Sequence, residues 1–289
     1  MSSSNHDKII EYYSASSHDY GQWSDDFNMH FGYLAGFKSW FSLEAMLQSM
    51  NTRIYRELAI APQSKSHLLD MGCGFGATAR AFSKAPGVDQ VTGITLVEMQ
   101  VEQAMKMSEP LAGAGKIRFE QGDYHRTRWP DEHFDGAYAL ESACHSQTSD
   151  KDELVQEAYR VIKHGARFAI GDGFIVGDAP LNAFTDHCYR MVCQHWSLGK
   201  LPEMTQLKRR MLAAGFEDIR IEDASWKVAP SMLYIPYLSA RYIAKRLFGQ
   251  LSGRDRRRGW GHVVASLYLV PMAFCLSRFR YYIVSGRKP

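Results

Sequence analysis

The sequence has few of the features that mark secreted, membrane-spanning or disulfide-rich proteins. It contains five cysteines in 289 residues, an odd number without a closely spaced pair, so we expect free thiols in a reducing compartment. The longest apolar stretch, residues 263–276, is interrupted by Pro271 and is shorter than the roughly 18 to 20 residues that a spanning helix needs. Residues 1–8 are polar and contain no apolar signal-peptide core. These absences predict a soluble cytoplasmic protein.

Charge is nearly balanced over the whole chain but is uneven along it. The formal net charge is +3, yet residues 241–289 carry eleven Lys or Arg residues and one acid, so the preceding 240 residues are net acidic. A cationic segment attracts phosphate groups, acidic membrane surfaces or nucleic acid, unless it is only a solvated helix face. With 45% hydrophobic residues the chain can form a sizeable core, which excludes intrinsic disorder.

Short aliphatic runs alternate with helix-length amphipathic segments between about residues 67 and 172. This alternation is typical of βαβ units and predicts an α/β fold, with a parallel sheet and helices on both faces. The expected strands are residues 67–71, 90–95, 117–121, 134–139 and 167–171, followed by 216–224 and 281–285. The expected helices are residues 40–58, 150–163 and 205–214, the second of them ended by Lys163-His164-Gly165.

A glycine-rich turn, residues 68–76 (LLDMGCGFG), joins a buried strand to a helix expected from about Ala77. Its three glycines let the backbone turn sharply off the strand tip and approach a ligand closely, and the helix start offers free N–H groups. At the carboxyl end of a parallel sheet this arrangement is typical of a nucleotide-type site. Dinucleotide-binding proteins space their glycines differently.

This turn resembles motif I of the class I S-adenosylmethionine-dependent methyltransferases, written apolar-apolar-Asp-x-Gly-x-Gly-x-Gly. The resemblance implies a Rossmann-like, seven-stranded, mostly parallel sheet, with S-adenosylmethionine as cofactor and S-adenosylhomocysteine as product. It places Asp70 near the methionine amino group and Gly72, Cys73, Gly74 and Gly76 along the cofactor. The chemistry agrees, because the ammonium and sulfonium groups both favour a nearby carboxylate.

Two later segments resemble further cofactor-binding motifs of this family. Most members end the second strand in an acid that binds the ribose, whereas this chain has Thr95 there. The pattern of Thr95, Leu96 and Gln100 resembles the branch of cyclopropane synthases and of sterol, tocopherol and prenyl diphosphate C-methyltransferases. After the third strand, Asp123 matches the residue that accepts a hydrogen bond from the adenine amino group, and Tyr124 would flank the ring. A turn-capping role is the alternative for Asp123.

The segment after the fourth strand faces the transferred methyl group in this family. C-methylation of an alkene produces a carbocation, which requires aromatic faces to stabilise it and a base to remove a proton. Glu141 and His145 follow that strand four residues apart, a spacing that can place both on one face of a helical turn. A Glu at the position of Glu141 resembles the sterol and prenyl diphosphate branch. We expect Glu141 to be the base or the cation-stabilising group, with His145 second.

An aromatic segment near the N-terminus resembles the His-aromatic-Gly-aromatic cap of many small-molecule methyltransferases. It contains His30, Phe31 and Tyr33, and it is preceded by Tyr20 and Trp23. Any one of these rings can simply pack an N-terminal helix onto the domain. As a set they predict an apolar roof over the acceptor, with Tyr20, Trp23 and Phe31 contacting it and with His30 and Tyr33 as further catalytic candidates.

Cationic side chains later in the chain are candidates for acceptor binding. His187, Arg190 and His195 are spaced so that Arg190 lies near both histidines, and such a group can bind a diphosphate. The run from Arg254 to Arg258 is a second candidate for a diphosphate or a membrane, or else a solvated surface. The Cys and His residues between 187 and 195 do not have zinc-site spacing, so no metal is expected.

Together these features predict the organisation and the activity of the chain. We expect a helical cap over residues 1–60 and a methyltransferase domain over 61–289, with acceptor lids at about 177–202 and 228–276. The expected activity is C-methylation of a small lipophilic acceptor in terpenoid biosynthesis, at a double bond of an isoprenoid or prenyl diphosphate, with rearrangement or cyclisation as a further step.

Other acceptors and partners remain open. The alternatives are O-, N- or C-methylation of a quinone, phenol or amine and, more distantly, methylation of nucleic acid. The segment after the fourth strand is not of the Asn-Pro-Pro-Tyr type, which disfavours base methylation, so no nucleic-acid partner is expected. Peripheral membrane contact through the basic C-terminal segment and formation of a homo-oligomer are further expectations.

Overall fold

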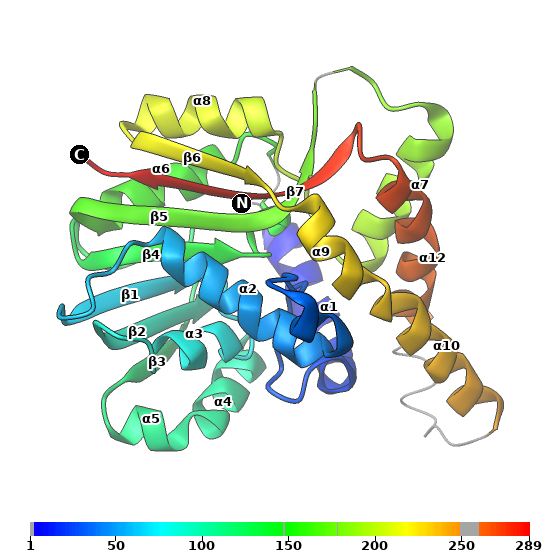
Figure 1. Ribbon diagram of the computed structural model, residues 1–289, viewed down its shortest axis with the longest axis horizontal. Helices are drawn as coiled ribbons and strands as arrows, with labels where there is room; N and C mark the ends of the chain where they lie inside the picture. The colour runs from blue at the N-terminus through cyan, green and yellow to red at the C-terminus, as the bar shows by residue number, and fades with distance from the viewer. Residues whose placement is uncertain (1–2, 147, 178, 249–259) are drawn as a thin grey trace.

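A seven-stranded sheet forms the centre of the protein (Figure 1). The structure is a computed structural model that describes residues 3–146, 148–177, 179–248 and 260–289. The strand order is β3-β2-β1-β4-β5-β7-β6, and within the described chain only β7 runs antiparallel to its neighbours. The strands are β1 (Ser66–Met71), β2 (Val88–Thr95), β3 (Ile117–Gln121), β4 (Phe134–Leu140), β5 (Ile162–Ile175), β6 (Glu217–Asp223) and β7 (Phe279–Arg287). The predicted α/β fold with a mostly parallel sheet is confirmed.

The predicted end of one helix is wrong. Helix α6 (Asp152–Val161) stops before the Lys163-His164-Gly165 sequence, which instead lies in the first part of β5. The reason is that Ile162 is completely buried and pairs with Phe134 at the start of β4. Pairing with β4 therefore ends the helix earlier than the Lys163-His164-Gly165 sequence predicts.

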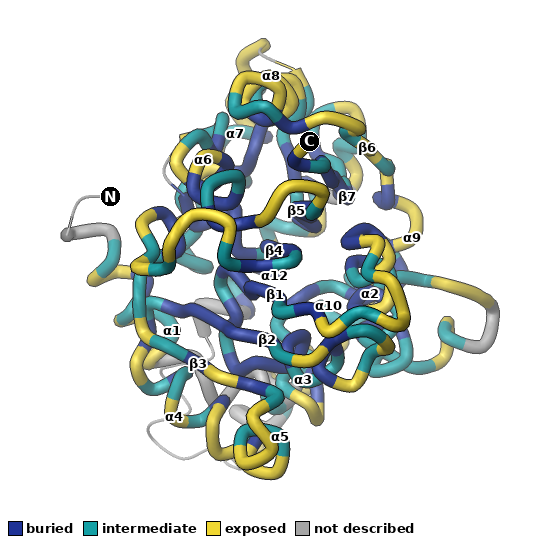
Figure 2. The backbone as a smooth tube through the Cα atoms, turned by 90° about the vertical axis from the view of Figure 1, so that its left-hand side faces the viewer, coloured by how far each residue is buried: buried dark blue, intermediate teal, exposed yellow. Residues whose placement is uncertain are grey.

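Helices cover both faces of the sheet. Buried side chains of α6 and α8 (Met204–Ala214) pack on one face, and those of α2 (Leu43–Glu57), α3 (Ala77–Phe82) and α4 (Glu98–Met107) pack on the other. In Figure 2 the central strands are mostly buried, whereas α8 and the short α5 (Glu109–Gly113) have much exposed surface. The helix expected at residues 40–58 is divided, because the Ser42 side chain caps the start of α2 after a 3-10 turn at Phe37–Phe41.

A second group of helices gathers beyond the carboxyl ends of the parallel strands (Figure 1). This group consists of α7 (Ala183–His195), α9 (Ser225–Met232), α10 (Tyr234–Leu247) and α12 (Trp260–Phe274), together with α1 (Ser3–Trp23) from the N-terminal segment. Within the described residues no helix is both long and apolar enough to cross a lipid bilayer.

Candidate active site

The turn after β1 contributes two glycines to the lining of a narrow cleft. Gly72 and Gly74 have φ angles of +106° and +50°, in the left-handed region that favours glycine. A Cβ atom at Gly72 would lie 2.3 Å from Cβ of Ser142, and one at Gly74 would lie 2.6 Å from Sδ of Met29. A side chain at either position would collide with Ser142 or Met29, so the turn requires glycine at both.

Asp70 provides a carboxyl group in the lining of this cleft. It is 3% exposed, and its Oδ2 accepts a hydrogen bond of 2.9 Å from the hydroxyl of Tyr138. Burial raises the pKa of Asp70 to about 7, and the bond from Tyr138 opposes this only in part. A ligand ammonium beside this carboxylate would supply the missing positive charge, which fits the methionine end of S-adenosylmethionine.

Thr95 and Gln100 also line the cleft. Both are buried, and Oγ1 of Thr95 donates a hydrogen bond of 2.7 Å to Oε1 of Gln100. This bond orients the amide so that its Nε2 lies 4.0 Å from Sδ of Met29. The structure thus brings together the residues that the sequence predicted for the ribose and methionine parts of the cofactor.

Asp123 lies beside the cleft rather than in its lining. Although burial raises its pKa, the side chain and backbone N–H of His125 hydrogen-bond the carboxylate, and His6 of α1 lies 3.3 Å away, so the pKa falls to about 2. Tyr124 does line the cleft, and its hydroxyl donates to the carbonyl of Ser142. Gly76 is also outside the lining, because a Cβ there would meet the ring of Phe119 at 2.3 Å.

The cleft is narrow because the N-terminal segment closes it. Its volume is about 80 Å³. This is below the roughly 300 Å³ of the smallest ligand pockets. Eight predicted cofactor residues line it, namely Asp70, Gly72, Cys73, Gly74, Thr95, Leu96, Gln100 and Tyr124, and Ile9, Tyr13, Phe27 and Met29 cover it from the N-terminal side. Admission of a cofactor therefore requires side chains of the N-terminal segment, Met29 among them, to move.

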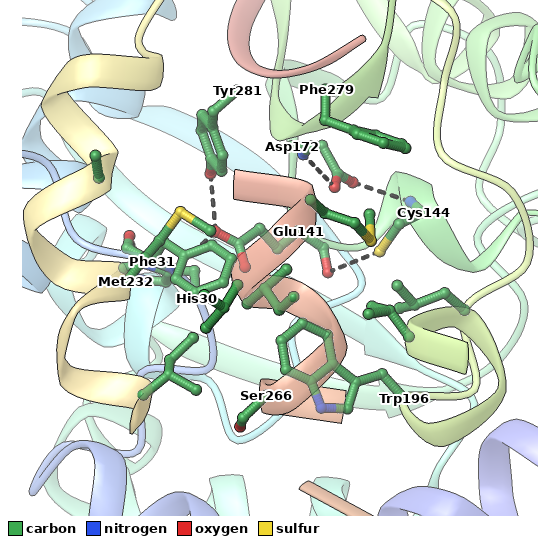
Figure 3. A pocket seen from close by; sticks show the side chains of 18 of the residues that line it. His30, Phe31, Glu141, Cys144, Asp172, Trp196, Met232, Ser266, Phe279 and Tyr281 are labelled. Carbon is green, nitrogen blue, oxygen red and sulfur yellow. Dashed lines mark hydrogen bonds between the residues drawn. The ribbon is translucent and has the colours of Figure 1, made fainter. Parts of the chain in front are cut away.

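A large apolar cavity adjoins the cleft (Figure 3). Its volume is about 940 Å³, and its walls come from the N-terminal segment, the strand ends and helices α7, α9, α10 and α12. Five residues line both the cleft and the cavity: Tyr13, Met29, His30, Glu141 and His145. Because these residues form the junction, a group transferred from the cleft would enter the cavity past them.

Glu141 lies at this junction in a strained backbone conformation. It directly follows β4 and has a φ angle of +48°, which is uncommon for a residue other than glycine. Its Oε1 accepts hydrogen bonds from the backbone N–H of Phe31 at 2.7 Å and the hydroxyl of Tyr281 at 2.9 Å (Figure 3). Enclosure in the apolar site and the charge of Asp172 raise its pKa to about 8, against these two hydrogen bonds. The ionised form, which can accept a proton, therefore increases as the pH rises through about 8.

The two histidines at the junction are held by other groups. In His145, Nδ1 lies 3.1 Å from the carbonyl of Ser197 and Nε2 lies 2.7 Å from the hydroxyl of Tyr13. Burial lowers the pKa of His145 to about 4, so its ring is neutral. Burial also lowers the pKa of His30 to about 4, and both of its ring nitrogens have hydrogen-bond partners. Glu141 is therefore the better placed base.

One predicted catalytic residue, Tyr33, and three predicted acceptor-binding residues on α7 do not line the cavity, contrary to expectation. The Tyr33 hydroxyl donates to Glu222 outside it. On α7, His187 packs against the ring of Tyr268, Arg190 pairs with Asp186, and His195 is also outside the lining. The side chain of Tyr20 and the run from Arg254 to Arg258 lie outside the part of the chain that the structure describes. Trp23 and Phe31 do line the cavity.

The error on α7 has a geometric cause. The cavity face of this helix and the turn that follows it carries Tyr189, Val192 and Trp196, which are three and four residues apart. The three predicted residues occupy other positions around the same helix. The sequence suggested that the segment covers the acceptor, but it did not show which face of the helix does so.

Two further polar residues of the site were missed in the sequence. Asp172 lines the cavity and accepts hydrogen bonds from the backbone N–H groups of Cys144 and Gly173, and burial raises its pKa. Its position directly after the strand expected at residues 167–171 was the available signal. Tyr281 reaches Glu141 from β7, and no local pattern indicated that contact. Among the described residues, no cluster of three or more His, Cys, Asp or Glu side chains is arranged to hold a metal ion.

Comparison with known proteins identifies the class of protein. A family model described as a methyltransferase domain matches residues 68–165. The 27-O-demethylrifamycin SV methyltransferase of Amycolatopsis mediterranei (strain S699) is 31% identical over 206 residues, which are 71% of this chain and 72% of that protein. The cycloartenol-C-24-methyltransferase 1 of Oryza sativa subsp. japonica is 27% identical over 242 residues, covering 82% of this chain and 66% of that protein.

A solved structure has the same fold over almost the whole chain. Geranyl diphosphate C-methyltransferase from Streptomyces coelicolor A3(2), in complex with Mg²⁺, geranyl-S-thiolodiphosphate and S-adenosyl-L-homocysteine, matches with a TM-score of 0.73 and 15% identity. The match covers 99% of this chain and 98% of that chain. In several other curated relatives, the match spans about half of the relative's length.

The chain belongs to the class I S-adenosylmethionine-dependent methyltransferases of small molecules. The residues of the cleft fit the cofactor of this family once Met29 moves away from the glycine turn, because Asp70 lacks a cationic partner among the described residues. When bound, the cofactor supplies an electrophilic methyl group on a sulfonium sulfur.

Proposed function

We propose that the protein methylates a carbon–carbon double bond of an uncharged isoprenoid. The observation that carries the proposal is the carboxyl group of Glu141 at the junction between the cofactor cleft and an apolar cavity of about 940 Å³. This volume lies near the upper end of the range for small-molecule pockets, roughly 300 to 1,000 Å³. A lipophilic acceptor of substantial size would fill it.

The walls of the cavity suit a reaction through a carbocation. When the π electrons of the acceptor bond to the methyl carbon and its bond to sulfur breaks, positive charge develops on the neighbouring acceptor carbon. The faces of Phe31, Trp23 and Tyr281 can stabilise that charge. Glu141 would then remove a proton from the adjacent carbon, and the electrons of that C–H bond restore a double bond.

The charge distribution supports an uncharged isoprenoid over a prenyl diphosphate. Within the described residues, the only Lys or Arg side chain that lines the cavity is Arg280. It is paired with Asp223 and also donates to the carbonyl of Leu276. Burying a diphosphate without cations would be unfavourable. The relative that methylates cycloartenol, according to its name, is consistent with a neutral acceptor.

O-methylation is the second candidate. It is supported by the similarity to the 27-O-demethylrifamycin SV methyltransferase, whose name describes that activity on a large natural product. Glu141 could accept the proton of an acceptor hydroxyl as readily as one from carbon. The roomy cavity suits either acceptor.

A substrate panel with methyl-labelled S-adenosylmethionine tests the proposal. We expect label to enter an uncharged isoprenoid such as farnesol or squalene, and mass spectrometry should show the gain of one CH₂ unit on carbon. The panel includes farnesyl diphosphate, a phenol, a quinone and an amine. Labelling of the phenol, quinone or amine alone would favour the second candidate, and a preference for the diphosphate would contradict an uncharged acceptor.

A further inference from the structure

Asp172 is a buried carboxylate to which the proposed reaction assigns no part. It lies near the carboxyl end of β5 and is 3% exposed. Its Oδ1 accepts a hydrogen bond of 2.8 Å from the backbone N–H of Gly173, and its Oδ2 accepts one of 2.9 Å from the backbone N–H of Cys144. Burying a charge is costly even when it is hydrogen-bonded, so an acid at this place points to a role that a neutral residue would not fill.

The hydrogen bond from Cys144 joins Asp172 to the turn that carries Glu141 (Figure 3). Cys144 belongs to the 3-10 turn at Ala143–His145, directly beyond the strained backbone of Glu141. The same part of β5 also holds Glu141 itself, because the backbone N–H of Glu141 donates a hydrogen bond of 2.8 Å to the carbonyl of Gly171. β5 therefore holds this turn at two points, one before and one after the strained position.

A buried lysine holds the end of the same turn. Lys151 is completely buried, and its ammonium donates hydrogen bonds to the carbonyl of Ser146, at 2.9 Å, and to the carbonyl of Lys200. Lys200 follows α7 and lies between Leu198 and Leu201, which both line the cavity. The ammonium of Lys151 therefore joins the turn after β4 to the wall of the acceptor cavity.

Asp172 supplies the negative charge that faces Glu141. The titratable side chains around Glu141 come from the N-terminal segment, its own turn, β5 and β7, and they are His30, Cys144, His145, Asp172 and Tyr281. Burial lowers the pKa of both histidines to about 4 and raises the pKa of Cys144 and of Tyr281 well above their usual values. These four side chains are therefore uncharged at neutral pH.

Lys151 supplies a positive charge that faces Asp172. The titratable side chains around Asp172 come from the loop after β3, the turn after β4, the start of α6 and β7, and they are Tyr124, Glu141, Cys144, Lys151 and Tyr281. Burial raises the pKa of Asp172, but the N–H of Cys144 and the charge of Lys151 oppose this rise and favour the ionised form. Asp172 is therefore a carboxylate at neutral pH although it is buried.

From this geometry we infer that Asp172 is a positioning residue, whose carboxylate fixes the turn that carries Glu141 and whose negative charge makes Glu141 a stronger base. Lys151 keeps Asp172 ionised. A negative charge nearby disfavours loss of the proton from Glu141, so the carboxylate, once formed, binds a proton more tightly. The inference rests on the proposed function for the role of Glu141 as the base.

Asp172→Asn separates the charge from the hydrogen bond. Asparagine has nearly the same shape, and its carbonyl can still accept the hydrogen bond from Cys144. We expect the titration midpoint of the Glu141 carboxyl to move about one pH unit lower, because the neighbouring negative charge is removed. A ¹³C NMR titration of the side-chain carboxyl carbons measures this without a substrate, with the Glu141 signal assigned through Glu141→Gln.

The wild-type chain provides a second readout that does not depend on the folding of a variant. Because the two carboxyl groups interact, the Glu141 signal should shift in two steps, a small one as Asp172 ionises and a larger one as Glu141 ionises. A single step in the wild type, or an unchanged midpoint in Asp172→Asn, would overturn the inference.

Asp135→Asn is the matched control, because Asp135 lies at the other end of β4. Its carboxylate also accepts a hydrogen bond from a backbone N–H, that of His67, and also has a lysine nearby, Lys163. This variant should leave the Glu141 titration unchanged. An equal shift in Asp135→Asn and Asp172→Asn would show that the effect is not specific to Asp172 and would overturn the inference.

Asp172→Ala tests whether the carboxylate fixes the turn. It removes the acceptor of the Cys144 N–H as well as the charge, so the single-turnover rate should be about tenfold lower than in Asp172→Asn, with equal cofactor affinity. Equal rates in the two variants would overturn the positioning of the turn.

The outcomes separate this inference from the proposed function. A lowered Glu141 midpoint in Asp172→Asn, together with unchanged turnover in Glu141→Gln, would support the contact between the two carboxyl groups and refute Glu141 as the base. An unchanged midpoint, together with lost turnover in Glu141→Gln, would refute the role of Asp172 and leave the proposed function standing.

Discussion

Replacing Gly74 with valine is expected to lower the affinity for S-adenosylmethionine more than about 100-fold, or about 2.7 kcal/mol. Gly74 has a φ angle of +50°, where a non-glycine residue costs roughly 1–2 kcal/mol. In addition, the new Cβ would lie 2.6 Å from Sδ of Met29, on the side of the backbone that faces the cleft. Isothermal titration calorimetry with S-adenosylmethionine measures the effect.

Gly115→Val is the control for backbone strain alone. Gly115 has a φ angle of +72°, but a Cβ there would meet no atom within 4 Å, and the residue is not part of the cleft. This variant should lose stability and keep its cofactor affinity. Wild-type affinity in Gly74→Val would show that the turn after β1 does not hold the cofactor.

Glu141→Gln is expected to reduce turnover by about 10²- to 10⁴-fold, the usual contribution of a general base. Glutamine keeps the shape of the side chain and can accept the same hydrogen bonds from Phe31 and Tyr281. Cofactor affinity should therefore change little. Single-turnover kinetics and calorimetry on the same preparation separate the two effects, and unchanged turnover would remove Glu141 from the mechanism.

The pH profile gives an independent check on the same residue. Because the pKa of Glu141 is raised to about 8, its ionised form, which is the base, increases as the pH rises through that value. The wild-type rate should rise with it and then level off. Tyr281→Phe removes a hydrogen bond that stabilises the carboxylate, so the rise should move to higher pH, whereas Glu141→Gln should abolish it.

The fold and the cofactor cleft were predictable because their signals are local. A strand, a glycine turn with left-handed backbone and a helix start lie within residues 66–82, and the geometry follows from those residue types. Thr95 and Gln100 are likewise joined by one strand end and one helix turn. Expected strands were correct to within a few residues, except that β5 is longer at both ends.

For the apolar cavity, the sequence predicted only which segments cover it and not which side chains line it. Its wall depends on side chains from helices far apart in the sequence, such as Trp196 after α7 and Ser266 on α12. Tyr281 reaches the site because β7 inserts between β5 and β6, a pairing that periodicity does not determine. The choice of face on α7 also depends on this packing, which explains why His187, Arg190 and His195 were wrongly selected.

A crystal structure of the protein with S-adenosylhomocysteine tests the central claim most directly. We expect the amino group of the ligand to lie beside Asp70, with Met29 displaced from the glycine turn and the sulfur directed toward Glu141 and the apolar cavity. A ligand bound elsewhere, or bound with its sulfur turned away from Glu141, would contradict the account.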